Sequence, residues 1–264
     1  MKIPVRIVGA ALLVLWLFLI GFAVSVVYSI KDIQFSIGEM RINVTTQNEV
    51  FFSLPMTIFN KGYYSLKSFN ISTEILNGQG SRITHAVTFV PVIGEGEAVN
   101  ITEEIELNLT DVLRTYQSFL FNDAELQVSR TVSMSVAEII PVQVAANSSL
   151  SWGAPLYNFR IGKPEIIEYG GVGSTVYSKA IVPMSFENHA FFDFDGLVKV
   201  RMYSNANALL GYGETAVAVP QHSSFNGNVE LEIVPERVTR TGYFEVFFES
   251  SFFSFGPLVI PYEG

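Results

Sequence analysis

Histidines and closely spaced carboxylates are the side chains of this sequence best suited to catalysis or metal binding. The three histidines are His85, His189 and His222, and none lies in an HExxH or other metal-ligand spacing. No GxSxG motif marks a serine nucleophile, and the chain has no cysteine. We therefore expect no catalytic residue and no cofactor, and we interpret the histidines as surface or loop residues.

Two acidic stretches could still form sites. The segment Asp193–Gly196 alternates carboxylates before a glycine as a calcium loop does, but the remaining ligands are missing, so we predict an Asp-Gly turn and no metal. The second stretch holds Glu95, Glu97, Glu103, Glu104 and Glu106. It could supply a general acid and a general base, yet Glu104 and Glu106 alternate with apolar residues, which predicts the solvent-facing side of a strand.

A long apolar run precedes every acidic residue of the chain. Residues 7–30 contain no charge, and as a helix they would measure about 36 Å, enough to cross a hydrocarbon core of about 30 Å. Residues 1–6 carry two basic side chains, whereas Lys31 and Asp32 cancel after the run, so the positive-inside rule predicts a cytoplasmic end at 1–6. We expect a single-pass signal-anchor helix in the cell membrane, with the C-terminal domains extracytoplasmic.

Two alternatives concern this helix. Ala23 and Ser25 have the small side chains and the spacing of a signal-peptidase site, which would make the run a cleaved signal peptide, although apolar residues continue to Ile30. Gly21 and Ser25 form a small-xxx-small pair that could serve as a dimer face, so a homo-oligomer stays open.

Charge and acceptor sites characterise the outer part of the chain. It holds 25 acids against 14 bases, a net charge of −11, which disfavours nucleic acid and anionic lipid headgroups as partners. Acceptor sites for N-glycosylation occur at Asn43, Asn70, Asn100, Asn108 and Asn147. Because all five lie in the membrane-proximal part, we expect that part to carry any glycans.

The sequence contains an internal repeat. "LPMTIFNKGYYSLKSF" at residues 54–69 and "VPMSFENHAFFDFDGL" at 182–197 place Pro-Met, an Asn and an aromatic pair 128 residues apart. This period predicts two tandem domains at 31–152 and 153–264. We interpret Asn60 and Asn188 as structural turn residues that end equivalent strands.

The distance between matching segments of the two copies changes along the chain. "FSIG" at Phe35 matches "FRIG" at Phe159, 124 residues later, whereas "VQVAANSS" at Val142 matches "FEVFFESS" at Phe244, only 102 residues later. The first copy should therefore hold about 24 extra residues, which we place at 111–136. A helix is expected near 111–121, because Thr110 could cap it and its apolar residues share one face.

Elsewhere the pattern predicts β-strands. Apolar and polar residues alternate along many short segments, and Asn77-Gly78, Gly170-Gly171 and Asn226-Gly227 are hairpin turn signals. Residues 170–174, "GGVGS", lack the lysine of a phosphate loop. We expect an all-β fold of two antiparallel β-sandwiches after the N-terminal helix.

These residues resemble a known family. "MTIFNKGYYSLKSFNISTEILNGQG", "EEIELNLTDVLRTYQSFLF" and "AELQVSRTVSMSVAEIIPVQV" are similar to the late embryogenesis abundant group 2 (water stress and hypersensitive response) domain. The resemblance covers residues 33–152 and, in reduced form, 157–260. It implies a fold like fibronectin type III with one helix, and no enzyme. The family usually has Pro after the Asn, where this chain has Lys61 and His189.

Aromatic residues near the C-terminus are the candidate interaction surface. The alignment above places Phe244, Phe247 and Phe248 where the first copy has Val142, Ala145 and Ala146. Since side chains alternate along a strand, Phe247 should face away from its two neighbours in that set. We expect either that these rings refill the space of the missing helix, or that Phe247, Phe253 and Phe255 dock a partner, a lipid or a second copy.

The function expected from the sequence is non-enzymatic. The chain should act as a membrane-anchored structural, protective or interaction module at the cell surface. One alternative is a lipid-binding or hydrophobic-ligand-binding protein of the same family type. Another is a pilin-like surface subunit, because pilins also join an apolar N-terminal helix to a β domain.

Overall fold

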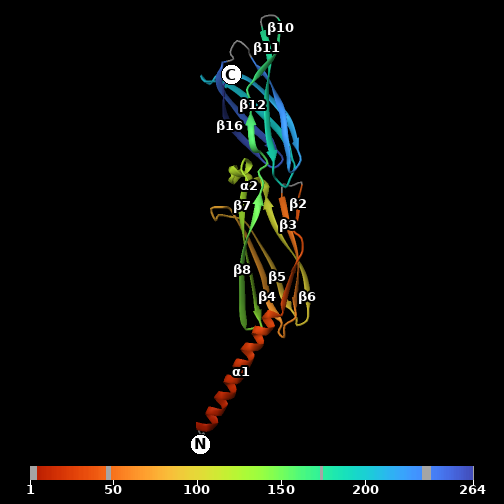
Figure 1. Cartoon of the computed structure of the whole chain (residues 1–264), viewed down its shortest axis with the longest axis vertical. Coiled ribbons are helices and arrows are strands. Elements are labelled where there is room, and N and C mark those ends of the chain that lie inside the picture. Colours follow the sequence, from red (N-terminus) through yellow and green to blue (C-terminus); the bar gives the residue numbers. More distant parts are fainter. Residues whose placement is uncertain (1–4, 46–48, 173–174, 234–238, 264) are drawn as a thin grey trace. The chain divides into compact units, whose positions relative to one another are not determined.

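The computed structural model describes residues 5–45, 49–172, 175–233 and 239–263. Its contacts divide the chain into two compact units. The first unit comprises Met1–Asn43, Phe51–Glu106 and Gln127–Ser148, and the second comprises Val44–Val50, Leu107–Leu126 and Ser149–Gly264. Antiparallel strands dominate both units, which confirms the all-β prediction (Figure 1).

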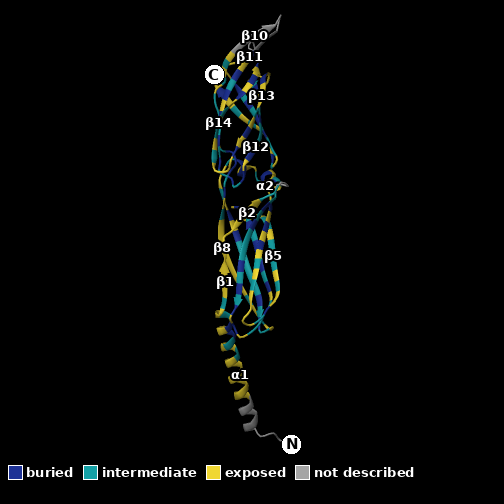
Figure 2. Cartoon of the chain, turned by 90° about the vertical axis from the view of Figure 1, so that its right-hand side faces the viewer, coloured by how far each residue is buried: buried dark blue, intermediate teal, exposed yellow. Residues whose placement is uncertain are grey.

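The N-terminal helix α1 runs from Val5 to Lys31 (Figure 1). Leu12–Lys31 is long and apolar enough to cross a membrane. Most of the described part of the helix is exposed (Figure 2), including the side chains from Leu12 to Ile20. Val26 and Ser29 are buried against the first sandwich. The helix is therefore apolar on all sides along most of its length and joins a protein core only at its end.

Among the described residues, eight strands come from the first copy of the repeat. They are β1 (Ile33–Ile37), β2 (Arg41–Val44), β3 (Glu49–Asn60), β4 (Leu66–Leu76), β5 (Arg82–Ile93), β6 (Ala98–Asn108), β7 (Ala124–Val136) and β8 (Ile140–Trp152). One sheet pairs β3 with β1, β2 and β6, and the other has the order β5-β4-β7-β8. Buried residues alternate along β3, β4 and β6, as expected for two sheets that each turn one face to a shared core.

Eight further strands come from the second copy. They are β9 (Tyr157–Ile161), β10 (Glu165–Val172), β11 (Thr175–Asn188), β12 (Phe194–Ser204), β13 (Leu209–Val219), β14 (Ser223–Ile233), β15 (Thr241–Ser250) and β16 (Ser254–Glu263). They form one sheet of order β10-β11-β14-β13-β12-β15-β16, with β9 beside β11. This order repeats the two sheets of the first copy, now joined between β13 and β14.

The junction of β13 and β14 consists of two residue pairs, Gly211 with Ile233 and Tyr212 with Glu232. A Cβ on Gly213 would overlap the carbonyl oxygen of Glu230, so glycine allows this close approach. The first copy has a side-chain hydrogen bond near the equivalent place. There the Thr84 hydroxyl donates to the Glu106 carbonyl at 2.7 Å.

The two copies of the repeat make the same strand pairs. Ile37 lies opposite Met56 in the β1–β3 ladder, and Ile161 lies opposite Met184 in the β9–β11 ladder. The next residue closes each strand in the same way. Gly38 N–H donates to the Pro55 carbonyl at 2.9 Å, and Gly162 N–H donates to the Pro183 carbonyl at 2.7 Å.

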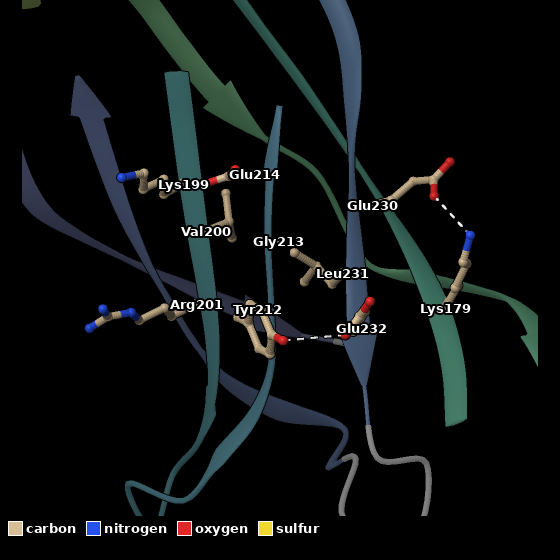
Figure 3. A pocket seen from close by; sticks show the side chains of 10 residues that line it. All are labelled: Lys179, Lys199, Val200, Arg201, Tyr212, Gly213, Glu214, Glu230, Leu231 and Glu232. Carbon is tan, nitrogen blue, oxygen red and sulfur yellow. Dashed lines mark hydrogen bonds and ion pairs between the residues drawn. The ribbon is translucent and has the colours of Figure 1, made fainter. Parts of the chain in front are cut away.

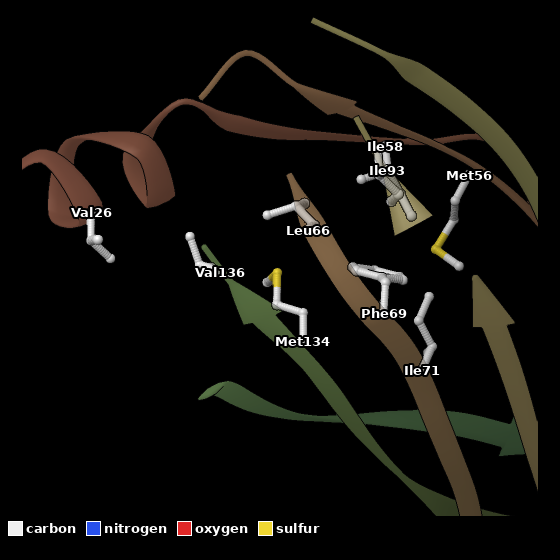
Figure 4. Close-up of a cluster of buried hydrophobic side chains, with 9 residues drawn as sticks. All are labelled: Val26, Met56, Ile58, Leu66, Phe69, Ile71, Ile93, Met134 and Val136. Atoms are coloured by element: carbon white, nitrogen blue, oxygen red, sulfur yellow. The ribbon is translucent and has the colours of Figure 1, made fainter. Parts of the chain in front are cut away.

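The core of the first unit lies between its sheets and extends to helix α1 (Figure 4). Its buried members are Val26, Met56, Ile58, Leu66, Phe69, Ile71, Ile93, Met134 and Val136. Val26 is 3% exposed and belongs to the helix, so the apolar segment contributes directly to the sandwich core. Burying such side chains is the main stabilising term in folding.

The expected helix forms, but it differs from the prediction. Residues Leu109–Thr115 make the α-helix α2, and residues Gln117–Leu120 make a 3-10 helix. The N-cap is Asn108, whose side chain accepts a hydrogen bond from the Asp111 N–H at 2.9 Å, rather than the predicted Thr110. Asn108 can cap because its short amide reaches the free N–H groups of the first turn.

We expected the helical segment to belong to the first sandwich, but its contacts group it with the second unit. The Trp152 indole N–H donates to the Phe119 carbonyl at 2.9 Å. The Phe121 ring lies 6.0 Å from that of Phe248 and 5.2 Å from that of Phe255. The helical segment therefore covers apolar rings of the second unit.

The predicted insertion at 111–136 is also wrong in its bounds. Strand β7 takes the place in its sheet that β15 takes in the other copy, so β7 is not an insertion. Residues 109–123, between β6 and β7, hold α2 and the 3-10 helix. The alignment of Val142 with Phe244 was wrong by one strand, because alternating strands resemble one another.

Two turn predictions are wrong and one is confirmed. Asn77 begins a turn, with its N–H donating to the Ser81 carbonyl at 2.9 Å. Asn226-Gly227 instead lies within β14, and Asp195-Gly196 lies within β12. Gly170 and Gly171 pair with Tyr177 and Val176 near the end of the β10–β11 hairpin, whose residues 173–174 lie outside the described part.

Candidate functional site

The three histidines have different surroundings. His85 lies exposed on β5, with Nε2 3.1 Å from the Ser72 hydroxyl, and His222 occupies a turn with φ of 56°. Among the described residues no group of three or more histidines and carboxylates is placed to hold a metal ion. Asp193 caps a loop, since its carboxylate accepts from the Gln221 N–H at 2.9 Å.

His189 belongs to a group of polar contacts in the second unit. Its Nδ1 lies 2.8 Å from the Asp123 carboxylate, and its Nε2 lies 3.0 Å from the Glu187 carboxylate. The ring stacks on Tyr157 with centroids 4.2 Å apart. The other oxygen of Asp123 accepts from the Ala154 N–H at 2.8 Å, so the group ties the loop after the 3-10 helix to strands β9 and β11.

The charge on His189 depends on these neighbours. Burial alone would lower the pKa of His189, but hydrogen bonds and charges from Asp123 and Glu187 outweigh it and raise the pKa above 6.5. Both ring nitrogens face carboxylates, so the doubly protonated imidazolium satisfies both contacts. We interpret the group as a structural clamp, because the carboxylates of Asp123 and Glu187 occupy both ring nitrogens of His189.

Glu103 is a buried charge that the sequence pattern did not reveal. Glu104 and Glu106 are exposed as predicted, but Glu103 faces inward and is 0% exposed. Its carboxylate accepts from the Thr73 hydroxyl and pairs with Arg130 Nη2 at 2.9 Å. Arg130 Nε also donates to the Thr73 hydroxyl at 3.1 Å. Three strands, β4, β6 and β7, are therefore joined by one polar group inside the first unit.

A groove on the outer face of the second unit is the candidate binding site (Figure 3). It has a volume of about 550 Å³ and opens beside the short junction of β13 and β14, where those strands separate. Its charged lining consists of Lys179, Lys199, Arg201, Glu214, Glu230 and Glu232. Tyr212, which is 57% exposed, lies among them.

The groove separates its charges by strand. Basic side chains come from β11 and β12, and acidic side chains come from β13 and β14 (Figure 3). Lys179 pairs with Glu230 at 3.3 Å, and the Tyr212 hydroxyl donates to Glu232 at 3.3 Å. Such exposed pairs exchange readily with polar groups of a ligand, because each contributes little stability. The charged and polar lining of the groove suits a polar ligand.

The aromatic face beside the groove continues onto β15. The Arg201 guanidinium lies 5.0 Å from the Phe247 ring centroid, and Tyr203 stacks on Tyr243 at 5.2 Å. Desolvation raises the pKa of Tyr243, with the Glu245 charge adding to the effect, so its hydroxyl stays protonated and donates to Asn207 at 3.1 Å.

The three predicted docking residues have different environments. Phe253 is 6% exposed and stacks on Phe194 at 5.6 Å, so its prediction as a surface residue is wrong. Phe255 is half-buried beneath Phe121. Phe247 is half-buried on the face opposite Phe244 and Phe248, as the alternation predicted.

The glycosylation candidates lie on strands or at the helix cap. Asn43, Asn100, Asn108 and Asn147 are exposed, and Asn70 is half-buried in β4, which lies between β5 and β7 in its sheet. Asn100 Oδ1 accepts from the Thr57 hydroxyl at 2.7 Å, and Asn108 is occupied as a cap. Their use as acceptors stays a prediction. Asn60 and Asn188, predicted as turn residues, are fully buried where β3 and β11 end.

No protein-family model matches the chain, and no curated protein matches it. Solved structures with weak similarity include a red sea bream transglutaminase (13% identity, TM-score 0.32, 88% of this chain and 31% of that chain). Others are a Mobiluncus mulieris adhesin (8%, 0.33, 81% and 80%) and the periplasmic chaperone SfaE (11%, 0.30, 88% and 100%). This chain thus spans under a third of the transglutaminase, and such low scores carry no argument about function.

Proposed function

We propose that this chain is a membrane-anchored, extracytoplasmic protein without enzymatic activity, whose tandem β-sandwiches serve as structural, protective or interaction modules at the cell surface. The observation that carries the proposal is the packing of the last two turns of α1 into the first sandwich. A segment that is both apolar enough to span a membrane and part of a folded core is a retained anchor.

Four of the α1 side chains that face the sandwich define a packed stripe. They are Phe22, Ser25, Val26 and Ser29, spaced i, i+3, i+4 and i+7 on one helix face. The Ser25 and Tyr64 hydroxyls lie 2.7 Å apart, and the Tyr64 N–H donates to Ser29 Oγ at 3.3 Å. The Phe22 ring meets the Tyr64 ring edge-on at 5.9 Å.

Cleavage after Ser25 would remove half of this stripe. It would delete Phe22 and Ser25 and leave Val26 at a free, charged amino terminus inside the core cluster. The signal-peptide alternative therefore conflicts with the packing of the sandwich. Lys2 and Arg6 support a cytoplasmic amino terminus and an extracytoplasmic position for both units.

The resemblance to the late embryogenesis abundant group 2 domain is part of the same proposal and supports a non-enzymatic role. Binding of lipid or another hydrophobic ligand is the alternative of that family type. The charged lining of the described groove favours a polar partner instead. A lipid that stays bound one per chain after extensive detergent exchange would support the alternative.

The test combines mass spectrometry with protease accessibility. Full-length chain extracted from membranes should keep residues 1–25, and protease added outside intact cells should digest both sandwiches while an N-terminal tag stays protected until lysis. A mature protein that begins near Val26 would refute the retained anchor. Protection of the sandwiches in intact cells would refute the orientation.

A further inference from the structure

We propose that the rim of the first sandwich beside α1 is a lipid-contact surface that lies in the interfacial layer of the membrane, with Tyr63 and Ile139 inserted among the headgroups. This inference rests on the proposed anchor and goes beyond it, because it assigns a membrane-binding role to loops of the sandwich itself.

The first step compares two faces of the same helix turns. Between Phe22 and Ser29 one face of α1 packs on the sandwich. The opposite face of these turns remains exposed and apolar, with Val24, Val27 and Tyr28 at 49%, 54% and 58% exposure. If lipid covers the exposed face, the sandwich loops on the packed face lie at the same depth.

Helix length decides whether lipid reaches these turns. A hydrocarbon core of about 30 Å needs about 20 helical residues, so a span that begins at Ile7 ends near Val26. Sandwich contacts begin at Phe22, about 6 Å earlier along the axis. Tilting of the helix would move the boundary further toward Tyr28. The contact zone therefore overlaps the outer hydrocarbon and headgroup layers.

Strand register places three loops at this rim. Leu66, the first residue of β4, pairs with Ile93 of β5 and with Val136 of β7. The loops that follow β3, β5 and β7 thus share the end of the sandwich that packs on α1. One of them contacts the helix directly, because a Cβ on Gly62 would overlap Ser29 Oγ.

The rim carries two large apolar side chains without cover. Tyr63 is 66% exposed and Ile139 is 72% exposed, the highest exposure among the large hydrophobic residues described outside α1. They come from different loops, 61–65 and 137–139, and both loops adjoin the packed stripe of α1. Tyrosine is the side chain expected at a membrane interface, since its ring is apolar and its hydroxyl stays hydrated.

Charges at the rim are mixed rather than basic. Lys67 pairs with Glu138 at 2.6 Å, and Glu97 accepts from the Gly94 N–H at 2.6 Å. Lys61 and Glu95 add one charge of each sign. Such a rim suits zwitterionic phosphatidylcholine-like headgroups, whereas recognition of anionic lipid would need a cluster of basic residues.

The absence of cysteine allows a direct measurement of depth. Single-cysteine variants Tyr63→Cys and Ile139→Cys of the full chain would carry a nitroxide label in phosphatidylcholine nanodiscs. For each label, the collision rate with oxygen, which partitions into lipid, is compared with the collision rate with a water-soluble nickel chelate. Leu13→Cys serves as the lipid control, because that side chain is 60% exposed in the apolar part of α1.

Gln79→Cys is the matched aqueous control, because Gln79 is exposed in the turn at the opposite end of β4. Labels at 63 and 139 should collide with the nickel chelate several-fold less than the label at 79, and with oxygen more. If they behave like the label at 79 while the label at 13 is lipid-like, the rim proposal is overturned and the anchor stands. If the label at 13 is also aqueous, the anchor itself is refuted.

Discussion

Asn60 and Asn188 hold the ends of equivalent strands with the same set of hydrogen bonds. Each Oδ1 accepts from the N–H two residues later, Gly62 at 3.1 Å and Ala190 at 3.0 Å. Each Nδ2 donates to the carbonyl four residues later, and also to two adjacent carbonyls about 30 residues further on. Both side chains are 0% exposed, so one amide replaces water for several buried backbone groups.

The first prediction concerns these two amides. Asn60→Ala and Asn188→Ala should each lower the free energy of unfolding by about 2–3 kcal/mol, because removing the amide leaves buried carbonyls without donors. Thermal or urea unfolding of the full chain in detergent would measure the loss. Asn226→Ala, at an exposed asparagine on β14, is the control and should change stability by less than about 0.5 kcal/mol. Equal effects of all three substitutions would contradict a structural role for the buried pair.

The second prediction concerns the contact of helix and sandwich. Gly62→Ala should destabilise the first unit by about 1–3 kcal/mol, because the new Cβ would overlap Ser29 and force α1 away from the core. Gly78→Ala is the matched control, since nothing lies within 4 Å of a Cβ there. Differential scanning calorimetry of both variants gives the comparison. A Gly62→Ala protein as stable as the parent would show that α1 does not dock on the sandwich.

The third prediction concerns the buried charge on Glu103. Glu103→Leu alone should cost about 3–5 kcal/mol, because it leaves Arg130 partly buried without its partner. The double variant Glu103→Leu, Arg130→Met should recover most of that loss, since apolar replacement of a buried pair is often neutral. Denaturant unfolding of the single and double variants measures the recovery. A double variant less stable than the single one would argue that the pair is net stabilising.

An exposed ion pair provides the comparison for this result. Asp111 and Arg114 lie 2.7 Å apart on α2, but their side chains are 62% and 75% exposed. Asp111→Ala should therefore change stability by less than about 1 kcal/mol. Comparing the Glu103 and Asp111 variants tests the effect of burial on stability, because the N–O distances of the two ion pairs are similar, 2.9 and 2.7 Å.

The sequence predicted the parts of the fold that local pattern controls. Alternation identified the sheets, and the unshifted repeat placed Asn60 and Asn188 at equivalent strand ends. Lys61 and His189, which follow the two asparagines, also have a structural role. Their N–H groups, which proline lacks, donate to the carbonyls of Asp32 and Ala154 at 3.2 and 3.0 Å.

Long-range packing was harder to predict. Strand β7 was mistaken for an insertion because period-2 alternation does not distinguish one strand of a hairpin from the next. Glu103 belongs to an acidic run and carries no local sign that it faces Arg130 across the sandwich. The stripe Phe22, Ser25, Val26 and Ser29 was hidden within a run that is apolar on every side. Its two serines are the available signal, since they mark the face that meets Tyr64.

The last prediction concerns pH and the contacts of His189. Asp123 and Glu187 raise its pKa in the folded chain above the unfolded value of 6.5. A raised folded pKa means that the folded state binds the proton more tightly. The stabilisation is therefore complete below about pH 6.5 and is lost as pH rises through the folded pKa. Since the ring is 33% exposed, the contribution should stay below about 1 kcal/mol.

Measuring the melting temperature from about pH 5.5 to about 8.5 should show this loss in the parent chain. His189→Gln and Glu187→Gln should flatten the dependence, the first because nothing titrates and the second because one carboxylate no longer favours the imidazolium. His222→Gln is the control, because His222 is an exposed turn residue outside the His189 group, and the pH profile of this variant should match that of the parent. NMR titration of the His189 ring would give its pKa directly, and a value at or below 6.5 would contradict the clamp, because burial would then outweigh the carboxylates.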